Sequence, residues 1–384
     1  NDLNSFEAFL VAGAIAGALQ IVFGLLKGGK VALIFPSGVI KGMLVGIGLI
    51  IFLKQIPHLV GLDDVSEGDF EFIQQNGENT FTSITNIWGY NISNGAIVVS
   101  IISLLILIFW QFKFIQKNKI LSLIPGPLLA VISGIVMAKV FETSTFFKID
   151  KDHFVDIPLI KNYDELTDKL FFPDWNFIFD SQVWIIGVTI AIVASIETLL
   201  CVEATDNLDP YHKKVTPKDR ELVAQGASNV VASLIGGIPV TQVIVRSSAN
   251  IQAGGKTKIS AIFHGLLLIV AVFIIPKIIN MIPLATLAAV LIIVGYKLAK
   301  PQIFIDMYKK KMIQFLPFIT TVLFMIFTDL LKGVTIGFII ALIYIIYLNI
   351  KDGKFKLKNL QKSILPSENE VKGTLLTNIK LLNN

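Results

Sequence analysis

The stretch 236–255, which reads G-G-I-P-V-T-Q-V-I-V-R-S-S-A-N-I-Q-A-G-G, constrains the fold more than any other part of the chain. It is embedded in apolar sequence, yet it is too short and too interrupted to cross a membrane as one helix. The glycines and proline of Gly236–Pro239 predict the end of a preceding helix. The β-branched run Val240–Val245 predicts a short extended piece. A half-helix is then expected to begin at Arg246 and to end near the final Gly-Gly pair.

Composition places this stretch in a membrane. The chain has 384 residues, of which 54% are hydrophobic and 16% charged, and its mean hydropathy is +0.72. These values are typical of a polytopic membrane protein. Irregular backbone at membrane depth is tolerated only where it lines a cavity, and broken helices therefore mark binding sites in secondary transporters. The lysines that give the net charge of +5 cluster in short loops, so no nucleic-acid partner is expected. The one cysteine, Cys201, excludes an intrachain disulfide.

The chain contains only two arginines, and one of them lies inside the interrupted stretch. Arg220 falls in a charged loop, whereas Arg246 stands between V-I-V and the expected half-helix. An arginine at membrane depth costs roughly 3 kcal/mol on insertion scales, so it needs a partner or a function. A guanidinium beside a helix N-terminus is typical of an anion site. The alternatives are a structural ion pair and an arginine that reaches one membrane surface.

Hydropathy predicts a series of spans around this stretch. They are expected at 6–26, 37–59, 94–115, 120–141, 182–204, 258–280, 282–299, 312–328 and 330–349, with a more polar helix at 219–237. With the half-helix, the total is about eleven crossings or part-crossings. Lysine-rich loops alternate with acidic ones, which predicts an outside N-terminus and a cytoplasmic C-terminus. The acidic loops 60–93 and 142–181, with Trp88 and Trp175, are expected to form external caps or plain connectors.

A second polar feature lies in the predicted span that ends near residue 204. Glu197 follows a long apolar run and shares a helix face with Cys201, and Thr198 adds a further polar atom. A carboxylate inside the membrane binds a cation, carries a proton or pairs with a cation. We therefore expect Glu197 to act at the transport site, or to form a structural pair with Arg246, or both.

Other polar residues give weaker signals. We interpret His264 as a helix-end residue and Asp329 as a helix N-cap. The glycines in 38–48 are spaced for close helix packing. The sequence has no phosphate-binding loop, no hydrolase triad order and no zinc-protease motif. An enzyme is therefore not expected, and neither is a cofactor.

Several motifs together resemble those of the sulfate permease (SulP) family of inorganic anion transporters. They are F-P-S-G-V-I-K-G-M-L-V-G-I-G, E-T-L-L-C-V-E-A-T-D, G-G-I-P-V-T-Q-V-I-V-R-S-S-A-N-I-Q-A-G-G-K-T and T-D-L-L-K-G-V-x-x-G. The resemblance covers nearly the whole chain up to about residue 350. It implies an all-α polytopic membrane protein with an incomplete 7+7 inverted-repeat transporter fold and one broken segment, made of a strand and a half-helix.

The resemblance also implies how the chain is organised. Residues 1–350 correspond to transmembrane segments 4 to 14, with core and gate parts interleaved and the first three segments missing. Residues 351–384 correspond to a cytoplasmic linker toward an absent STAS domain. The expected setting is the inner membrane, and the full-length protein is expected to be a homodimer.

The resemblance further implies the site. It places the substrate near Arg246, with Ser247, Val245, Thr241 and Gln242 around it, and the coupling carboxylate at Glu197, with Cys201 and Thr198 beside it. In bicarbonate-transporting members of the family, an Asp and a Thr one turn later help to bind Na⁺. Here those positions are Glu197 and Cys201, so Na⁺ and H⁺ both stay open as coupling ions.

The sequence thus predicts secondary active transport of a small inorganic anion, sulfate or bicarbonate, by an elevator-like movement. One alternative is a nucleobase–cation symporter of the same architecture, which favours a second carboxylate where Arg246 stands. The other is a membrane protein that does not transport.

Overall fold

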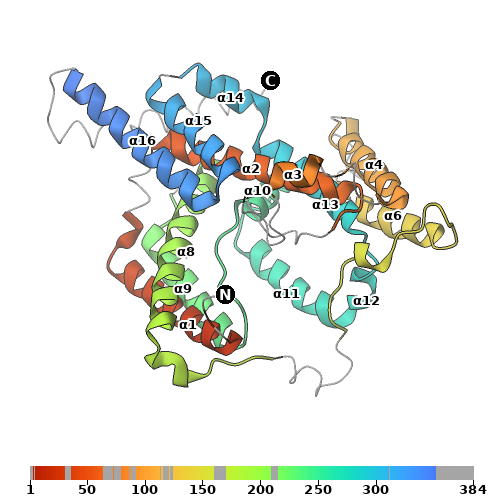
Figure 1. The fold of residues 1–384 in the computed structure, drawn as a ribbon, viewed down its shortest axis with the longest axis horizontal. Coiled ribbons are helices and arrows are strands. Elements are labelled where there is room, and N and C mark those ends of the chain that lie inside the picture. Colours follow the sequence, from red (N-terminus) through yellow and green to blue (C-terminus); the bar gives the residue numbers. More distant parts are fainter. Residues whose placement is uncertain are drawn as a thin grey trace. The chain divides into compact units, whose positions relative to one another are not determined.

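In a computed structural model of the chain, α-helices make up most of the residues that the structure describes (Figure 1). It describes residues 3, 5–30, 36–63, 72, 79–85, 87, 92–112, 114–115, 121, 124–159, 170–208, 215–310 and 312–351. The main helices are α1 (Phe6–Leu25), α2 (Ser37–Leu59), α3 (Thr80–Thr85), α4 (Asn94–Phe109), α6 (Gly126–Phe141), α8 (Ser181–Leu208), α9 (Lys218–Leu234), α10 (Ile244–Gln252), α11 (Ile259–Ile274), α12 (Pro276–Ile279), α13 (Leu284–Leu298), α14 (Pro301–Tyr308), α15 (Met312–Phe327) and α16 (Leu330–Lys351). Two short 3-10 helices, η4 (Lys151–His153) and η5 (Trp175–Phe179), lie between α6 and α8.

The helices confirm a multi-pass membrane protein. Four stretches of the described chain are long and apolar enough to span a bilayer: Phe6–Leu25, Ser37–Leu59, Ser181–Asp206 and Leu284–Tyr308. Five shorter apolar helices accompany them, at Asn94–Phe109, Gly126–Phe141, Ile259–Ile274, Met312–Phe327 and Lys332–Leu348. The spans expected at 94–115, 120–141 and 258–280 are each shortened by several residues in the structure, to α4, α6 and α11. The one expected at 258–280 is divided before Pro276, which cannot donate a backbone hydrogen bond.

The described residues contain no β-strand, and an isolated antiparallel bridge joins Phe154 to Pro283. The chain divides into two compact units. Unit 1 comprises 1–41, 160–262 and 338–384, and unit 2 comprises 42–159 and 263–337. The expected linker at 351–384 lies outside the described residues beyond Lys351.

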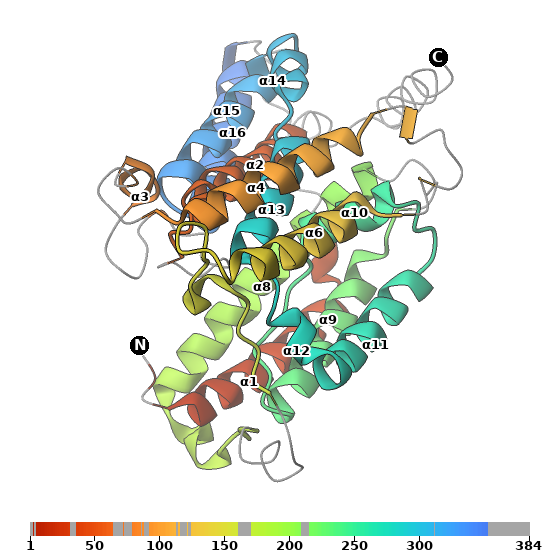
Figure 2. The same cartoon turned by 90° about the vertical axis from the view of Figure 1, so that its right-hand side faces the viewer.

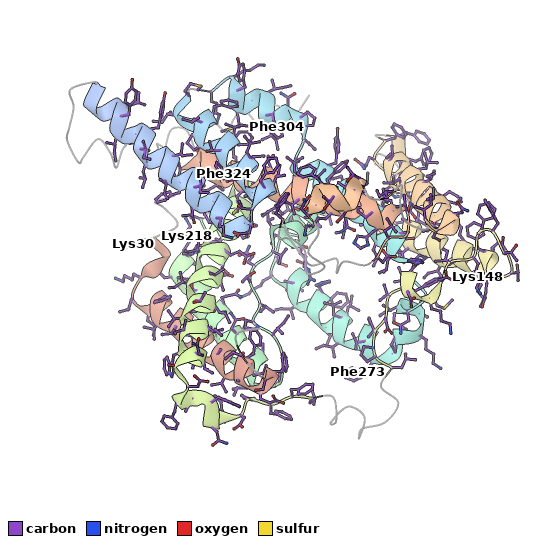
Figure 3. All side chains as sticks on the ribbon, in the orientation of Figure 1. Lys30, Lys148, Lys218, Phe273, Phe304 and Phe324 are labelled. Atoms are coloured by element: carbon purple, nitrogen blue, oxygen red, sulfur yellow. The ribbon has the colours of Figure 1, made fainter. Side chains whose placement is uncertain are left out.

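In unit 1, α1 packs along both α8 and α9 (Figures 1 and 2). The close approach of α1 and α9 depends on a pair of glycines. A Cβ atom on Gly226 would lie 2.5 Å from the carbonyl oxygen of Gly17, and one on Gly17 would lie 2.6 Å from the carbonyl oxygen of Gly226. At the other end of the contact, the backbone N–H of Gly29 donates to the Asp219 carboxylate. Lys30 and Lys218 lie at this end (Figure 3).

In unit 2, α2 is the helix against which others pack. Cβ atoms on Gly42 and Gly46 would lie under 3 Å from Phe318 and Met325 of α15, and one on Gly48 would lie 2.8 Å from the carbonyl oxygen of Gly295 in α13. The prediction that these glycines serve close helix packing is confirmed. The helices α4 and α6 run side by side, and both contact α13 (Figure 2).

The expectations for residues outside the interrupted stretch are tested in part. Asp329 caps α16, because its Oδ1 accepts the Lys332 N–H at 2.7 Å, as predicted. His264 lies near the start of α11, a helix with no buried residue, from which Phe273 projects outward (Figure 3). Trp175 is exposed at the start of η5, whereas Trp88 lies outside the described residues.

A buried carboxylate joins the end of α2 to the loop after α6 in unit 2. Asp63 accepts hydrogen bonds from Nδ1 of His58 at 2.5 Å and from Nδ1 of His153 at 2.7 Å. Burial alone would raise the pKa of Asp63, but the hydrogen bonds and charges of the two histidines outweigh it and leave the pKa lowered. The hydrogen bond that His153 donates to Asp63 raises the pKa of His153 against the effect of burial, and the charges of Asp63, Asp150 and Asp152 raise it further.

We predict that Gly226→Ala destabilises the protein by about 1–3 kcal/mol, because the new methyl group meets backbone atoms of α1 that have no room to move. Gly265→Ala in α11 is the matched control, since nothing lies within 4 Å of its added Cβ. Thermal unfolding in detergent measures both variants. Equal midpoints for the two would contradict this account of the α1–α9 contact.

We also predict a pH dependence for the Asp63 cluster. Asp63 stabilises the folded state at pH values above its ordinary pKa near 3.8. This stabilisation is lost as the pH falls through the lowered pKa that Asp63 has in the folded protein. His153 stabilises the folded state fully at pH values below its ordinary pKa near 6.5. This stabilisation is lost as the pH rises through the raised pKa that His153 has in the folded protein. The thermal midpoint of the wild type should therefore exceed that of Asp63→Asn by more at pH 6 than at pH 9. A difference that does not change with pH would show that the cluster carries no such charge interaction.

Candidate anion site at the interrupted helix

The helix interruption predicted from the sequence is present in unit 1. Helix α9 ends at Leu234, and α10 begins at Ile244. Gly236 takes a φ of +85°, and a Cβ there would lie 2.3 Å from the carbonyl oxygen of Phe171, so both backbone angle and space require glycine. The residues between the two helices carry no regular secondary structure.

Two details of the prediction are wrong. The expected strand is an extended segment without strand pairing, and it ends at Val243 rather than Val245. Arg246 is therefore the third residue of α10 and not its first. Ser247 N–H makes the first bond within this helix, to the Val243 carbonyl, so the N–H groups at positions 245 and 246 have no acceptor inside the helix.

The Arg246 side chain is exposed, and among the described residues it makes no ion pair. The pair with Glu197 that the sequence left open is therefore not formed. The Ser247 hydroxyl donates a hydrogen bond to the Val243 carbonyl at 3.2 Å. The backbone of Val245 is helical, and its side chain lies outside the described part. Arg246 thus presents a positive charge that no described side chain neutralises.

Glu197 is half-buried on α8 and contacts the interrupted stretch directly. Its carboxylate interacts with the side chain of Thr241, in the segment that leads into α10. The next residue, Gln242, donates from Nε2 to the Thr205 hydroxyl at 3.3 Å, and Thr205 donates to the Cys201 carbonyl at 2.7 Å. One face of α8 therefore holds consecutive residues of the extended segment.

Cys201 completes this contact. Its side chain is 2% exposed and interacts with the backbone N–H of Ile244, the first residue of α10. Cys201 was expected to belong to a coupling-ion site, and the structure places its side chain at the start of α10. Val243, at the N-cap position, has no side-chain oxygen or nitrogen with which to cap the helix.

Several residues next to Glu197 or Thr241 in the chain have a buried oxygen without a hydrogen-bond partner. The atoms are Oγ of Ser195, Oγ1 of Thr198 and Oε1 of Gln242, and the Thr198 side chain has no exposed surface. Unsatisfied buried oxygens are rare in folded proteins. No group of three or more His, Cys, Asp and Glu side chains suited to a metal ion occurs in the described part of the chain. Oxygen ligands from threonine and glutamine are therefore the ones this region offers.

The structure thus brings Glu197, Thr241, Gln242 and Cys201 together, with Thr198 adjacent, and places Arg246 and Ser247 in the first turns of the following helix. Sequence reasoning missed three buried amides that contact or support the same segment, Gln20, Gln225 and Asn229. The sequence signal that points to Gln225 and Asn229 is their i, i+4 spacing on the polar helix before the break.

The comparisons with known proteins agree with this architecture. An α-helical multi-pass chain with one interrupted helix and polar residues at the break is the arrangement of an inverted-repeat transporter. The family model described as "Sulfate permease family" matches residues 1–321. The chain therefore belongs to the sulfate permease family.

Among relatives, the chain is 30% identical to a putative sulfate transporter, YvdB, of Bacillus subtilis, over 88% of this chain and 60% of that protein. It is 26% identical to the bicarbonate transporter BicA of Picosynechococcus, over 73% of this chain and 45% of that protein. The chain thus spans less than two thirds of the length of these relatives.

Solved structures share the fold. The transmembrane domain of a cyanobacterial bicarbonate transporter, BicA, matches with a TM-score of 0.56 at 22% identity, over 88% of this chain and 77% of that one. The murine Solute Carrier 26 family member A9 anion transporter matches with a TM-score of 0.65 at 15% identity, over 90% of this chain and 53% of that one.

We predict that Arg246→Ala leaves stability within about 0.5 kcal/mol of wild type, because the side chain is exposed and unpaired among the described residues. Thr241→Val should cost about 1 kcal/mol, since it removes the hydroxyl that interacts with the half-buried Glu197 carboxylate. Thermal midpoints of the two variants in the same detergent check both values. A larger loss for Arg246→Ala than for Thr241→Val would contradict the assigned contacts.

Proposed function

We propose that this chain forms the membrane part of a secondary active transporter for a small inorganic anion, with sulfate and bicarbonate as the leading candidates. The anion binds at the start of α10, where Arg246 supplies the positive charge. Glu197 on α8 carries the Na⁺ or H⁺ that couples uptake to an ion gradient. The observation that carries the proposal is the contact of Glu197 with the extended segment that leads into α10.

The anion site is supported by charge and backbone geometry together. Arg246 has no ion-pair partner among the described residues, and it stands in the same helical turn as backbone N–H groups without intrahelical acceptors. Helix N-termini of this kind favour negative charge, and a guanidinium matches the oxygens of sulfate or bicarbonate with paired donors. Ser247, Thr241 and Gln242 lie next to this position in the chain and add polar groups.

The coupling site is supported by the oxygens around Glu197. A carboxylate on the same helix as the unpartnered oxygen of Thr198 suits a hard cation, which takes oxygen ligands, or a proton on the carboxylate itself. Cys201 contributes little to a Na⁺ site, because its sulfur is a soft ligand. Thr241 links Glu197 to the segment that leads into α10. Binding of Na⁺ or H⁺ at Glu197 therefore changes the position of α10.

An elevator-like movement fits the division of the chain. The elements that build the site, α8, α9 and α10, all belong to unit 1, and most of α2 with α4, α6 and α13 to α15 belongs to unit 2. A site built within one unit can move as a body against the other. We place the transporter in the inner membrane, as a homodimer in its full-length form.

The two alternatives are less well supported. A nucleobase–cation symporter would have a carboxylate where Arg246 stands, and the family match is to sulfate permeases. A membrane protein that does not transport gains no support from the two relatives compared above, which are named as a putative sulfate transporter and a bicarbonate transporter.

Uptake by the full-length protein in proteoliposomes tests the proposal. We predict saturable uptake of sulfate or bicarbonate and none of uracil. Glu197→Gln should lower gradient-driven uptake at least tenfold, because the amide can neither release a proton nor supply the charge that holds Na⁺. Glu142→Gln, the same substitution at an exposed position after α6, is the control and should retain uptake. Uptake of uracil alone, or normal coupled uptake by Glu197→Gln, would refute the proposal.

A further inference from the structure

Two amide side chains of α9 hold both backbone hydrogen-bonding groups of one residue in the interrupted stretch. The N–H of Val240 donates to Oδ1 of Asn229 at 2.7 Å, and the carbonyl of Val240 accepts a hydrogen bond from Nε2 of Gln225. Gln225 and Asn229 are four residues apart, so they project from one face of α9. We call this pair of contacts the amide clamp.

A third amide fixes the orientation of the clamp. Asn229 donates from Nδ2 to Oε1 of Gln20 on α1 at 2.7 Å, and neither side chain has exposed surface. The backbone N–H of Val240 determines which amide atoms make these hydrogen bonds. An N–H can only donate, so Asn229 must turn its oxygen to Val240 and its nitrogen to Gln20, which must then present its oxygen. The Nε2 of Gln20 is left buried without a partner, a cost that the fold accepts for this arrangement.

The clamp lies one residue before the contacts that build the candidate site. Thr241 reaches Glu197, Gln242 reaches Thr205, and the N–H of Ile244 reaches Cys201, all on α8. The extended segment is therefore held by α9 at Val240 and by α8 from the next residue onward. Since α10 begins four residues after Val240, a shift of Val240 moves the first turn of α10 and the Arg246 within it.

We propose that Gln225 and Asn229, with Gln20 behind them, are positioning residues for anion binding. They supply hydrogen bonds that the missing helix or strand pairing would otherwise supply, and so they set where Arg246 meets the anion. This inference rests on the proposed function. None of the three amides is placed in contact with the anion itself.

Two measurements on the full-length protein test the clamp. The first is the KM and maximal rate of sulfate or bicarbonate uptake. The second is the rate at which a maleimide alkylates Cys201, the only cysteine in this sequence and one that is buried against Ile244. We expect Asn229→Leu and Gln225→Leu each to raise KM roughly five- to tenfold, the effect of about one lost hydrogen bond. Alkylation of Cys201 should become faster, because the start of α10 is no longer fixed.

A double variant separates positioning from folding. Asn229→Leu alone leaves the Gln20 oxygen buried and unpaired, whereas Gln20→Leu with Asn229→Leu removes both polar partners and should recover thermal stability. The Val240 N–H still lacks its acceptor in the double variant, so KM should stay raised and alkylation fast. Gln55→Leu removes a 2%-exposed amide from α2 and is the control, with both readouts unchanged.

The outcomes distinguish the clamp from the proposed function. If the wild type transports no anion, the proposed function fails, and the alkylation rates still test the clamp. If KM and alkylation both return to wild-type values in the double variant, the amides serve stability only and the inference is overturned. Wild-type values in Asn229→Leu would overturn it as well.

Discussion

Backbone hydrogen bonding at the break between α9 and α10 is the constraint on which the site depends. A chain that leaves helical geometry inside an apolar environment must find partners for its N–H and carbonyl groups, since each unsatisfied group costs several kcal/mol. Here side chains of the flanking helices supply them. Asn229 and Gln225 hydrogen-bond to the backbone of Val240, and the Cys201 side chain interacts with the N–H of Ile244. The interrupted segment therefore explains why buried amides occur on α9 at positions 225 and 229.

Close helix packing makes this arrangement feasible. Gly17 and Gly226 let α1 approach α9 to backbone contact, which brings Gln20 within 2.7 Å of Asn229. The two charged side chains, Glu197 and Arg246, differ in their interaction partners. Glu197 interacts with Thr241, whereas Arg246 has no ion-pair partner among the described residues. An exposed guanidinium without such a partner is available to an anionic ligand, as the proposed anion site requires.

Much of this was accessible from the sequence, because the signals are local. Glycine and proline at 236–239 end α9 wherever the rest of the chain lies, and hydropathy finds the helices around it. Glu197 stands out because a carboxylate is rare in so apolar a run. The first residue of α10 was misjudged by two positions. The β-branched residues favour an extended chain, but in the structure Val243 is the extended N-cap and α10 begins at Ile244.

What could not be predicted depends on contacts between distant residues. Nothing in the local sequence says that Asn229 faces Val240 and Gln20, which are brought together only when α1, α9 and the extended segment pack. Likewise, Asp63 gives no sign in the sequence that it joins His58 to His153, because the second histidine is ninety residues further along the chain. The division of the span after α10 was within reach, since Pro276 marks it.

The account can be tested most directly by measuring equilibrium anion binding to the purified full-length protein at constant ionic strength. The titration compares sulfate and bicarbonate with a bulky organic anion, for the wild type and for Arg246→Ala. If Arg246 and the start of α10 form the site, the wild type binds one of the inorganic anions saturably. The folded variant then binds it at least tenfold more weakly, a loss of about 1.4 kcal/mol. Unchanged affinity in Arg246→Ala would place the anion elsewhere and contradict the central claim.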